Sequence, residues 1–307
     1  MRRQDIQLLA QARQAEARRW LQQLAQPWPV VWAANESAPG GVQWLVFEHG
    51  SAGLRLSGLA ADLAPAQAAA DALRALQRNW SAYPVLHHRR MALIAERLPP
   101  VKGRPLQFPQ AAPASHLGAW TLLAPDRMLA SPTKSSPFVN GECLFLEDHF
   151  NPPSRAYLKL WEACTRLGAW PQPGDECLDL GASPGGWTWA IADLGATVTA
   201  IDKADLHPRV AAMPGVTLRR ESAFALPPER VDWLFSDIIA YPDRLLALVK
   251  AWIAAAAPGR IVCTVKFQGA TDHEAAEAFA AIEGGQLMHL YHNKHELTFV
   301  WRKPEAP

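Results

Sequence analysis

A glycine-rich hinge between two strand-like runs carries the residue types that suit a small-molecule ligand. Residues 177–202 read CLDLGASPGGWTWAIADLGATVTAID, with Asp179 ending the first apolar run and Asp202 ending the second. Glycines there let the backbone approach a ligand where the next helix starts. Asp179 then lies beneath the hinge and Asp202 within reach of ribose hydroxyls. The alternative interpretation of the hinge is a tight strand-to-helix turn without a ligand.

The order of residues in the hinge disfavours a dinucleotide. A pyrophosphate-binding loop reads Gly-x-Gly-x-x-Gly, whereas this chain reads Gly-Ala-Ser-Pro-Gly-Gly from Gly181. Ser183 thus stands at the second glycine and Pro184 beside it. An adenosyl ligand without phosphates fits better, and S-adenosylmethionine is the predicted cofactor.

Alternating strand-like and helical patterns place the hinge in an α/β domain with a Rossmann-like, doubly wound sheet. The runs at 286–293 and 296–302 are separated by only about two residues, so they must pair antiparallel as a terminal hairpin. The expected parallel strands are 176–181, 197–202, 216–221, 231–237 and 260–267.

The N-terminal half predicts a smaller α+β domain. Proline-rich stretches at 97–115 and 130–155 mark boundaries, and the second is taken as the interdomain connection. The expected division is an N-terminal domain over 1–129, a linker over 130–153 and a C-terminal domain over 154–307. The expected N-terminal elements are helices near 3–25 and 65–80 and strands at 29–33, 42–48, 53–58 and 118–124.

Composition indicates an ordinary globular protein. The chain has 307 residues, of which 49% are hydrophobic and 19% are charged, enough for two domains with their own cores. The four cysteines are far apart and form no CxxC, which disfavours disulfides and zinc and fits a reducing cytoplasm. The N-terminus lacks the apolar core of a signal peptide, and no 18-residue apolar run occurs, so we expect a cytoplasmic protein without a membrane partner.

Positive charge is concentrated in the N-terminal half, which makes that half the better candidate for binding a polyanion. Residues 1–150 carry 15 Lys and Arg against 11 Asp and Glu, a net charge of +4, whereas residues 151–307 carry 15 against 18, a net charge of −3. The strongest basic run is at 87–104, and its alternative interpretation is a solvated helix face without an RNA partner. The candidate RNA-binding residues are Arg89, Arg90, Arg97, Lys102, Arg104 and, in the connecting loop, Lys134.

The stretch DLGASPGGWT at 179–188 is similar to the DLGA-x-PGGW cofactor loop of the FtsJ/RrmJ-type ribose 2'-O-methyltransferase family. The resemblance covers about residues 130–303 and is strongest to the RlmM-like branch, which modifies a cytidine of bacterial large-subunit (23S) rRNA. It implies a THUMP-like RNA-binding region in the N-terminal half and RNA, most simply rRNA, as the substrate. It also implies cofactor contacts at Ser154, Asp179, Gly181, Ser183, Pro184, Gly185, Gly186, Trp187, Asp202, Ser222 and Asp237.

The same resemblance implies a Lys-Asp-Lys-Glu catalytic tetrad of Lys159, Asp237, Lys266 and Glu296, found in PSRAYLKLWEA, WLFSDII, CTVKFQGA and NKHELTF. Asp237 and Lys266 end parallel strands, and Glu296 starts the antiparallel one, so all three reach one sheet edge. Separately, each lysine has a plainer interpretation as a solvated or surface ion-paired residue. Ser154 likewise reads as a helix N-cap and Trp187 as a core residue.

The chemistry explains these residue types. A ribose 2'-hydroxyl attacks the sulfonium methyl only as its proton is removed, and a lysine removes it only when neutral, which requires a pKa below the usual value of about 10.4. Lys266 is the candidate base and Lys159 the neighbouring cation, with Asp237 and Glu296 orienting both. How the four share their charges is left open by the sequence. Base assistance typically contributes about 10² to 10⁴ in rate, and alignment of the reactants supplies the rest.

One position departs from the family pattern, and several other motifs are absent. The family has an acid after the third strand that binds the adenine amino group, whereas this chain reads Glu221-Ser222. No Pro-Cys dipeptide of a cytosine C5 enzyme occurs, and NPPS at 151–154 lacks the aromatic residue of an amino-group methyltransferase. Histidines in HLYHNKH recur every three residues, which on a strand separates them onto opposite faces, so no metal is expected.

Two other functions are carried as alternatives. The chain could be a non-catalytic RNA-binding ribosome assembly factor, against which the four tetrad candidates argue. It could also be a methyltransferase for another RNA or for a small molecule.

Overall fold

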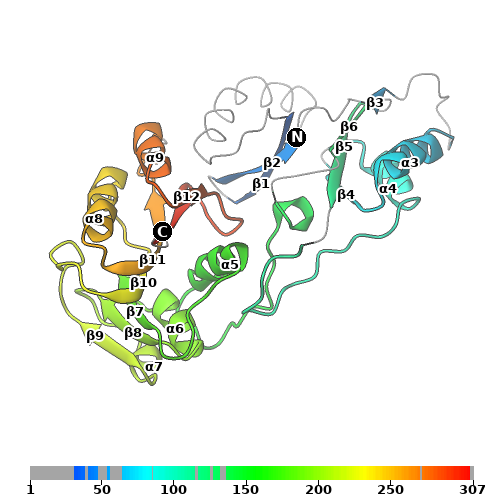
Figure 1. Cartoon of the computed structure of the whole chain (residues 1–307). Helices are drawn as coiled ribbons and strands as arrows, with labels where there is room; N and C mark the ends of the chain where they lie inside the picture. Colours follow the sequence, from blue (N-terminus) through cyan, green and yellow to red (C-terminus); the bar gives the residue numbers. More distant parts are fainter. Residues whose placement is uncertain are drawn as a thin grey trace. The chain divides into compact units, whose positions relative to one another are not determined.

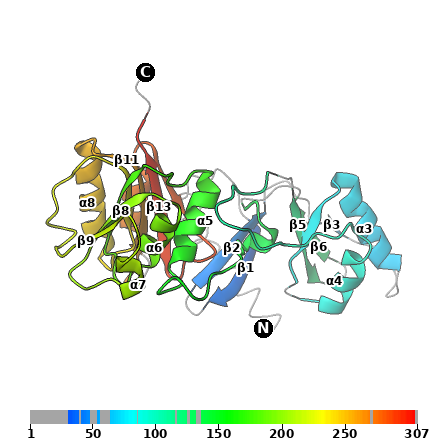
Figure 2. The same ribbon diagram turned by 90° about the horizontal axis from the view of Figure 1, so that it is seen from below.

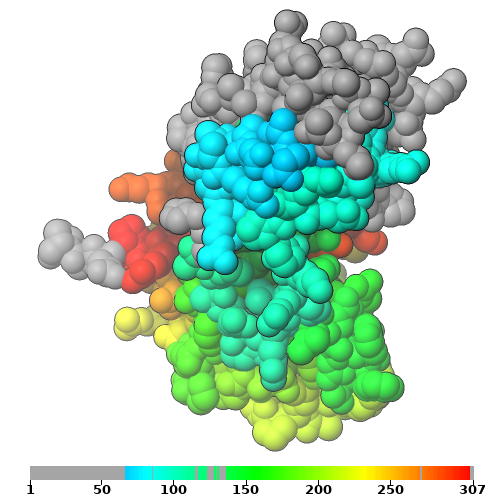
Figure 3. Space-filling model, turned by 90° about the vertical axis from the view of Figure 1, so that its right-hand side faces the viewer, coloured from blue at the N-terminus to red at the C-terminus, as the bar shows by residue number. Residues whose placement is uncertain are grey.

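A computed structural model gives the fold in two compact units, which are described separately. The first unit contains the described residues before 106 and residues 112–144, and the second contains residues 106–111 and those from 145 onward. The expected helix near 3–25 and the candidate Lys134 lie outside the described residues. Figure 3 shows one face of the molecule as a space-filling view. The described residues are 31–38, 41–47, 54–55, 64–84, 86–114, 117–124, 127–131, 136–269 and 272–304.

The second unit is built on a seven-stranded sheet, which confirms the predicted doubly wound α/β fold. The strand order is β12-β13-β11-β10-β7-β8-β9, with β13 antiparallel to both of its neighbours and all other pairs parallel. The strands are β7 (Glu176–Leu180), β8 (Thr197–Ile201), β9 (Val216–Arg219), β10 (Val231–Ser236), β11 (Pro258–Lys266), β12 (Gly285–Met288) and β13 (Glu296–Arg302).

Helices cover both faces of this sheet, as buried parallel strands require. Figures 1 and 2 show α5 and α6 on one face and α8 on the other. The central strands bury nearly all of their side chains between these layers, including Leu178, Leu234 and Val262. The helices are α5 (Tyr157–Leu167), α6 (Gly186–Asp193), α7 (Pro208–Ala211), α8 (Pro242–Ala254) and α9 (His273–Ala280).

The last two strands differ from the predicted tight hairpin. β12 ends at Met288, and seven residues, 289–295, connect it to β13. The histidines at 289, 292 and 295 therefore lie in this connection, and the expectation that they sit on a strand was wrong. The amide groups of residues 291 and 292 donate to a side chain of α5 instead of a neighbouring strand, which accounts for the early end of β12.

The first unit contains a four-stranded sheet in the order β3-β6-β5-β4 and a separate β1-β2 pair. Its core lies between the four-stranded sheet and two helices, and Ala66, Ala69, Ala70 and Leu73 of α3 are buried there at helical spacing. The elements are β1 (Val31–Ala38), β2 (Gly41–Phe47), β3 (Leu54–Arg55), α3 (Ala64–Leu76), β4 (Trp80–Ala82), α4 (His88–Ala95), β5 (Gly118–Ala124), β6 (Arg127–Ser131) and the 3-10 turn η1 (Val139–Gly141).

The first unit differs from the expectation in two elements. The helix expected to reach residue 80 ends at Leu76, and the buried Trp80, which starts strand β4, donates its indole N–H to the carbonyls of Leu73 and Gln77. Strand β6 was not predicted, although it pairs with β5 along most of its length. Among the described helices, none combines the length and the apolar character needed to cross a bilayer.

Candidate functional site

The glycine hinge joins β7 to α6 in a conformation that larger residues would not adopt. Gly181 has φ +74° and Gly185, the N-cap of α6, has φ +109°. A Cβ on Gly181 would lie 2.9 Å from the Cβ of Ile238, which is too close. The amide of Gly181 donates to the carbonyl of Ile201 at 2.9 Å, so the hinge is fastened to the end of β8.

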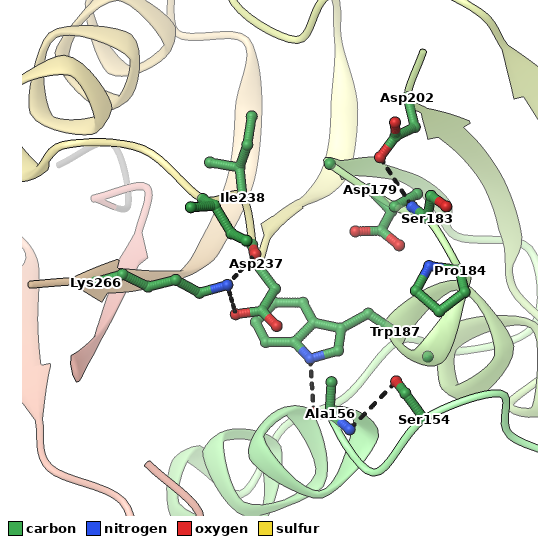
Figure 4. A pocket seen from close by; sticks show the side chains of 14 residues that line it. Ser154, Ala156, Asp179, Ser183, Pro184, Trp187, Asp202, Asp237, Ile238 and Lys266 are labelled. Carbon is green, nitrogen blue, oxygen red and sulfur yellow. Dashed lines mark hydrogen bonds and ion pairs between the residues drawn. The ribbon is translucent and has the colours of Figure 1, made fainter. Parts of the chain in front are cut away.

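Asp202 holds the hinge from the end of β8. Its Oδ2 accepts the amide of Ser183 at 3.0 Å and its Oδ1 accepts the amide of Ala204 at 2.9 Å. A carboxylate oxygen has two lone pairs, so both oxygens can still accept a ligand hydroxyl. Figure 4 shows this carboxylate at the rim of a pocket, above the hinge.

Asp179 is a fully buried acid beneath the hinge. Its side chain is 1% exposed, its Oδ2 accepts the hydroxyl of Thr188 at 2.7 Å, and its Oδ1 has no hydrogen-bond partner among the described residues. Burial raises the pKa of this carboxyl to about 7, against the opposing effect of the Thr188 hydrogen bond. An orphaned buried acceptor facing a pocket is the kind of group that a cationic ligand satisfies.

A pocket of about 320 Å³ lies over these groups, in the range of small-ligand sites. All of the predicted cofactor residues line it except Gly185 and Ser222. Ala156, Ala182, Ile238 and Ile239 also line it and were missed, because small and aliphatic residues in loops carry no chemical signal in a sequence. Lys266, predicted as a catalytic residue, lines it too, and Figure 4 shows its amine pointing toward Asp237.

Two of the lining residues, Ser154 and Trp187, are not simply a helix N-cap and a core residue. Ser154 is not the N-cap of α5, because the cap is Ala156 and the Ser154 hydroxyl only accepts its amide at 3.4 Å. Trp187 is buried and also reaches the pocket wall, since its indole N–H donates to the carbonyl of Ala156 at 2.8 Å. This hydrogen bond ties α6 to the segment before α5 (Figure 4).

The four predicted tetrad residues lie together at the carboxyl edge of the sheet. Lys159 Nζ is 2.7 Å from Asp237 Oδ1 and 3.2 Å from Glu296 Oε1. Lys266 Nζ is 3.1 Å from the same Asp237 oxygen and donates to the Asp237 carbonyl. Asp237 therefore bridges the two amines, and Lys159 bridges the two acids. All four side chains are 20% exposed or less.

The sheet register explains this convergence. Lys266 ends β11 and Glu296 begins β13, and the two are direct partners across the antiparallel pair. Asp237 follows the last residue of the neighbouring strand β10, and Lys159 lies in the first turn of α5. Only Asp237 and Lys266 of the four line the pocket, so Lys266 is the amine that a pocket ligand meets.

The described candidate RNA-binding residues of the first unit lie on α4 and the segment after it. Arg89, Lys102 and Arg104 are exposed, and Arg90 is half-buried. Arg97 is also half-buried and turns back to donate to the carbonyl of Leu93. Within the described residues, no group of three or more His, Cys, Asp or Glu side chains is arranged to hold a metal ion.

The hinge, the strand order and the single antiparallel strand of the sheet define a methyltransferase-type α/β domain. The family model described as FtsJ-like methyltransferase matches residues 152–282 of this chain.

Curated relatives carry one name, Ribosomal RNA large subunit methyltransferase M. The protein from Halorhodospira halophila is 38% identical over 162 residues, which are 50% of this chain and 48% of that protein. The protein from Alkalilimnicola ehrlichii is 36% identical over 168 residues, 50% and 47% of the two chains. The protein from Aromatoleum aromaticum is 36% identical over 162 residues, 47% and 44%. The chain thus spans about half the length of these relatives.

Proposed function

We propose that the protein is an S-adenosylmethionine-dependent RNA ribose 2'-O-methyltransferase that acts on a cytidine of large-subunit rRNA. The observation that carries this proposal is the meeting of two lysines and two acids, of which Asp237 and Lys266 line the hinge pocket. The names of the relatives support rRNA as the substrate. The basic surface of the first unit supports an RNA partner.

The residues of the pocket fit the cofactor. The orphaned Oδ1 of Asp179 suits the ammonium group of the methionine part, and Asp202 suits the ribose hydroxyls. Gly181 leaves the backbone open where a side chain would intrude. When bound, the cofactor supplies an electrophilic methyl group on a sulfonium sulfur. Ser222 does not line the pocket, so the adenine end would rely on other groups.

In the proposed mechanism Lys266 is the general base. Its Nζ would take the proton of the ribose 2'-hydroxyl, and the bound cofactor would supply the methyl group that the hydroxyl oxygen accepts. Lys159, held by Asp237 and Glu296, contacts the same Asp237 oxygen as Lys266 and so helps to fix the position of that carboxylate. Asp237 orients both amines through one oxygen, which aligns the base with the hydroxyl.

The proposal is tested by methyl transfer from labelled cofactor to rRNA that lacks the modification. Lys266→Met keeps the length and most of the packing of the side chain and removes the base, so we expect transfer to fall by about 10² to 10⁴. The matched control is Lys250→Met on the exposed face of α8, which should retain wild-type activity. If the wild type transfers methyl groups and Lys266→Met transfers them equally fast, the proposed mechanism is refuted. If the wild type methylates no rRNA, the proposed substrate is refuted.

A further inference from the structure

A buried carboxylate outside the tetrad holds the connection between β12 and β13. Glu162 is fully buried on α5, one turn after Lys159. Its Oε1 accepts the amide of Tyr291 at 2.9 Å and its Oε2 accepts the amide of His292 at 3.0 Å. Both oxygens are thus committed to backbone groups of a segment far away in the sequence. Hydrogen bonds to a charged group are stronger than those between neutral groups, so two of them hold that segment firmly.

Arg166 supplies the charge that lets this acid be buried. Its Nε and Nη2 lie 2.8 Å and 2.7 Å from Glu162 Oε1, one turn further along α5. A buried carboxylate is costly unless it is paired and its lone pairs are used, and both conditions are met here. An apolar residue at position 162 would avoid the free-energy cost of burying a charge, but it could not accept hydrogen bonds from the two amides. The pair therefore has a task beyond filling the core.

The position of Glu162 relative to the tetrad indicates that task. Lys159 and Glu162 are three residues apart, so they share one face of α5. Lys159 contacts the carboxylate of Glu296 at 3.2 Å, and Glu162 contacts the backbone four and five residues before it. The connection is also closed by the Thr298 hydroxyl, which donates to the buried Asn293 Oδ1 at 3.2 Å. One helix thus holds both the tetrad acid and the segment that leads to it.

We propose that Glu162, paired with Arg166, is a positioning residue that holds residues 289–295 so that Glu296 meets Lys159 in the tetrad. It touches neither substrate nor cofactor and acts through Glu296. The inference rests on the proposed function, because it assigns a task in methyl transfer. Its structural part, the tie between α5 and the connection, can be measured without activity.

The test uses Glu162→Gln in the full-length protein. The variant keeps the size of the side chain, loses the charge opposite Arg166, and presents an NH₂ group to one of the two amide donors. We expect kcat to fall about tenfold or more through misplacement of Glu296, with the Kd for S-adenosylhomocysteine within about twofold of wild type. Glu162→Asp, which keeps the charge but shortens the side chain, should show a smaller loss of kcat and serves if Glu162→Gln does not fold.

The matched control is Asp175→Asn. Asp175 Oδ2 also accepts two donors, the Gln172 amide at 2.9 Å and the Trp233 indole N–H at 3.0 Å, but it lies at the opposite edge of the sheet, before β7. This variant weakens comparable hydrogen bonds and should keep its kcat. An equal loss of kcat in Asp175→Asn would show that general loosening, and not positioning, explains the effect.

A double-mutant cycle with Glu296→Gln distinguishes positioning from a merely structural role. If Glu162 acts through Glu296, single-turnover rates should show about a tenfold loss for Glu162→Gln in the wild-type background and less than about twofold in the Glu296→Gln background. Losses that multiply in full would overturn the inference. So would a Glu162→Gln protein with wild-type kcat.

Hydrogen exchange separates this inference from the proposed function. Amide exchange in a peptide covering residues 289–298 should speed up in Glu162→Gln, whereas a peptide covering 258–266 should not change. If wild-type protein methylates no RNA, the proposed function fails while the exchange result still reports on the tie. If methyl transfer occurs but exchange and kcat are both unaffected by the substitution, only the positioning role is refuted.

Discussion

Asp179 is a buried acid whose ionisation costs stability, and Asp179→Asn removes that cost. Burial raises its pKa from 3.8 to about 7, so the folded protein holds the proton more tightly than the unfolded chain does. The stability gained from this proton is fully present below pH 3.8 and is lost as the pH rises to about 7. A shift of roughly three pKa units corresponds to about 4 kcal/mol.

The free energy of unfolding of Asp179→Asn, relative to that of the wild type, should therefore increase as the pH rises. Between pH 5 and pH 8 the wild type crosses about two units of this range, so the difference in unfolding free energy between variant and wild type should change by about 3 kcal/mol in favour of the variant. Urea denaturation at the two pH values measures it. The control is Asp148→Asn, where the Asn151 amide lowers the pKa of a partly exposed acid, so that its contribution is constant across the same range.

Protonation of Asp179 should weaken cofactor binding, although it stabilises the folded protein. The proposed contact with the ammonium group needs an ionised Asp179, so affinity for S-adenosylhomocysteine should weaken about eightfold from pH 7.5 to pH 6. Asp179→Asn should bind more weakly and lose this pH dependence, as calorimetric titration would show. A free-energy difference that is constant between pH 5 and pH 8 would refute the reasoning, because the buried carboxyl would then not titrate near pH 7.

Two further predictions concern ligand binding. Asp202→Ala should weaken binding of S-adenosylhomocysteine by about tenfold or more in calorimetry, but leave binding of its 2',3'-dideoxy analogue nearly unchanged. An equal loss for both ligands would mean that Asp202 serves only to hold the hinge amides. The double variant Arg89→Ala, Arg104→Ala should lower rRNA affinity and reduce the slope of log K against log salt by about one for each phosphate that the protein no longer binds. Lys250→Ala is the matched control, and an unchanged slope in the double variant would show that these arginines do not bind RNA.

Much of the second unit follows from local patterns. Strand-like runs separated by helical patterns are enough to predict parallel βαβ units, and the structure places β7, β8, β9, β10 and β11 within a few residues of the expected runs. The hinge is also legible, because the positive φ at Gly181 and Gly185 is a conformation that the sequence marks directly with glycine. These features depend on interactions between residues close together in the chain.

Expectations failed where a buried side chain hydrogen-bonds to the backbone at the end of an element. The Ala-rich helix ends at Leu76, and the Trp80 indole N–H donates to the carbonyls of Leu73 and Gln77. Strand β12 ends early because Glu162, on a helix far away in the sequence, accepts the amides of the connection. Neither interaction can be read from helical or strand periodicity.

The sequence by itself determined the class of fold, the hinge, and the presence of one lysine and two acids near the ends of sheet strands. Parallel strands bring their carboxyl ends to one edge, so order along the chain was enough for that much. Only the tertiary structure decided that Asp237 bridges both amines, that Lys266 alone of the two lysines lines the pocket, and that α5 contacts both Glu296 and the connection before it. Those relations are set by sheet register and by buried polar interactions between segments far apart in the chain, and no local pattern encodes them.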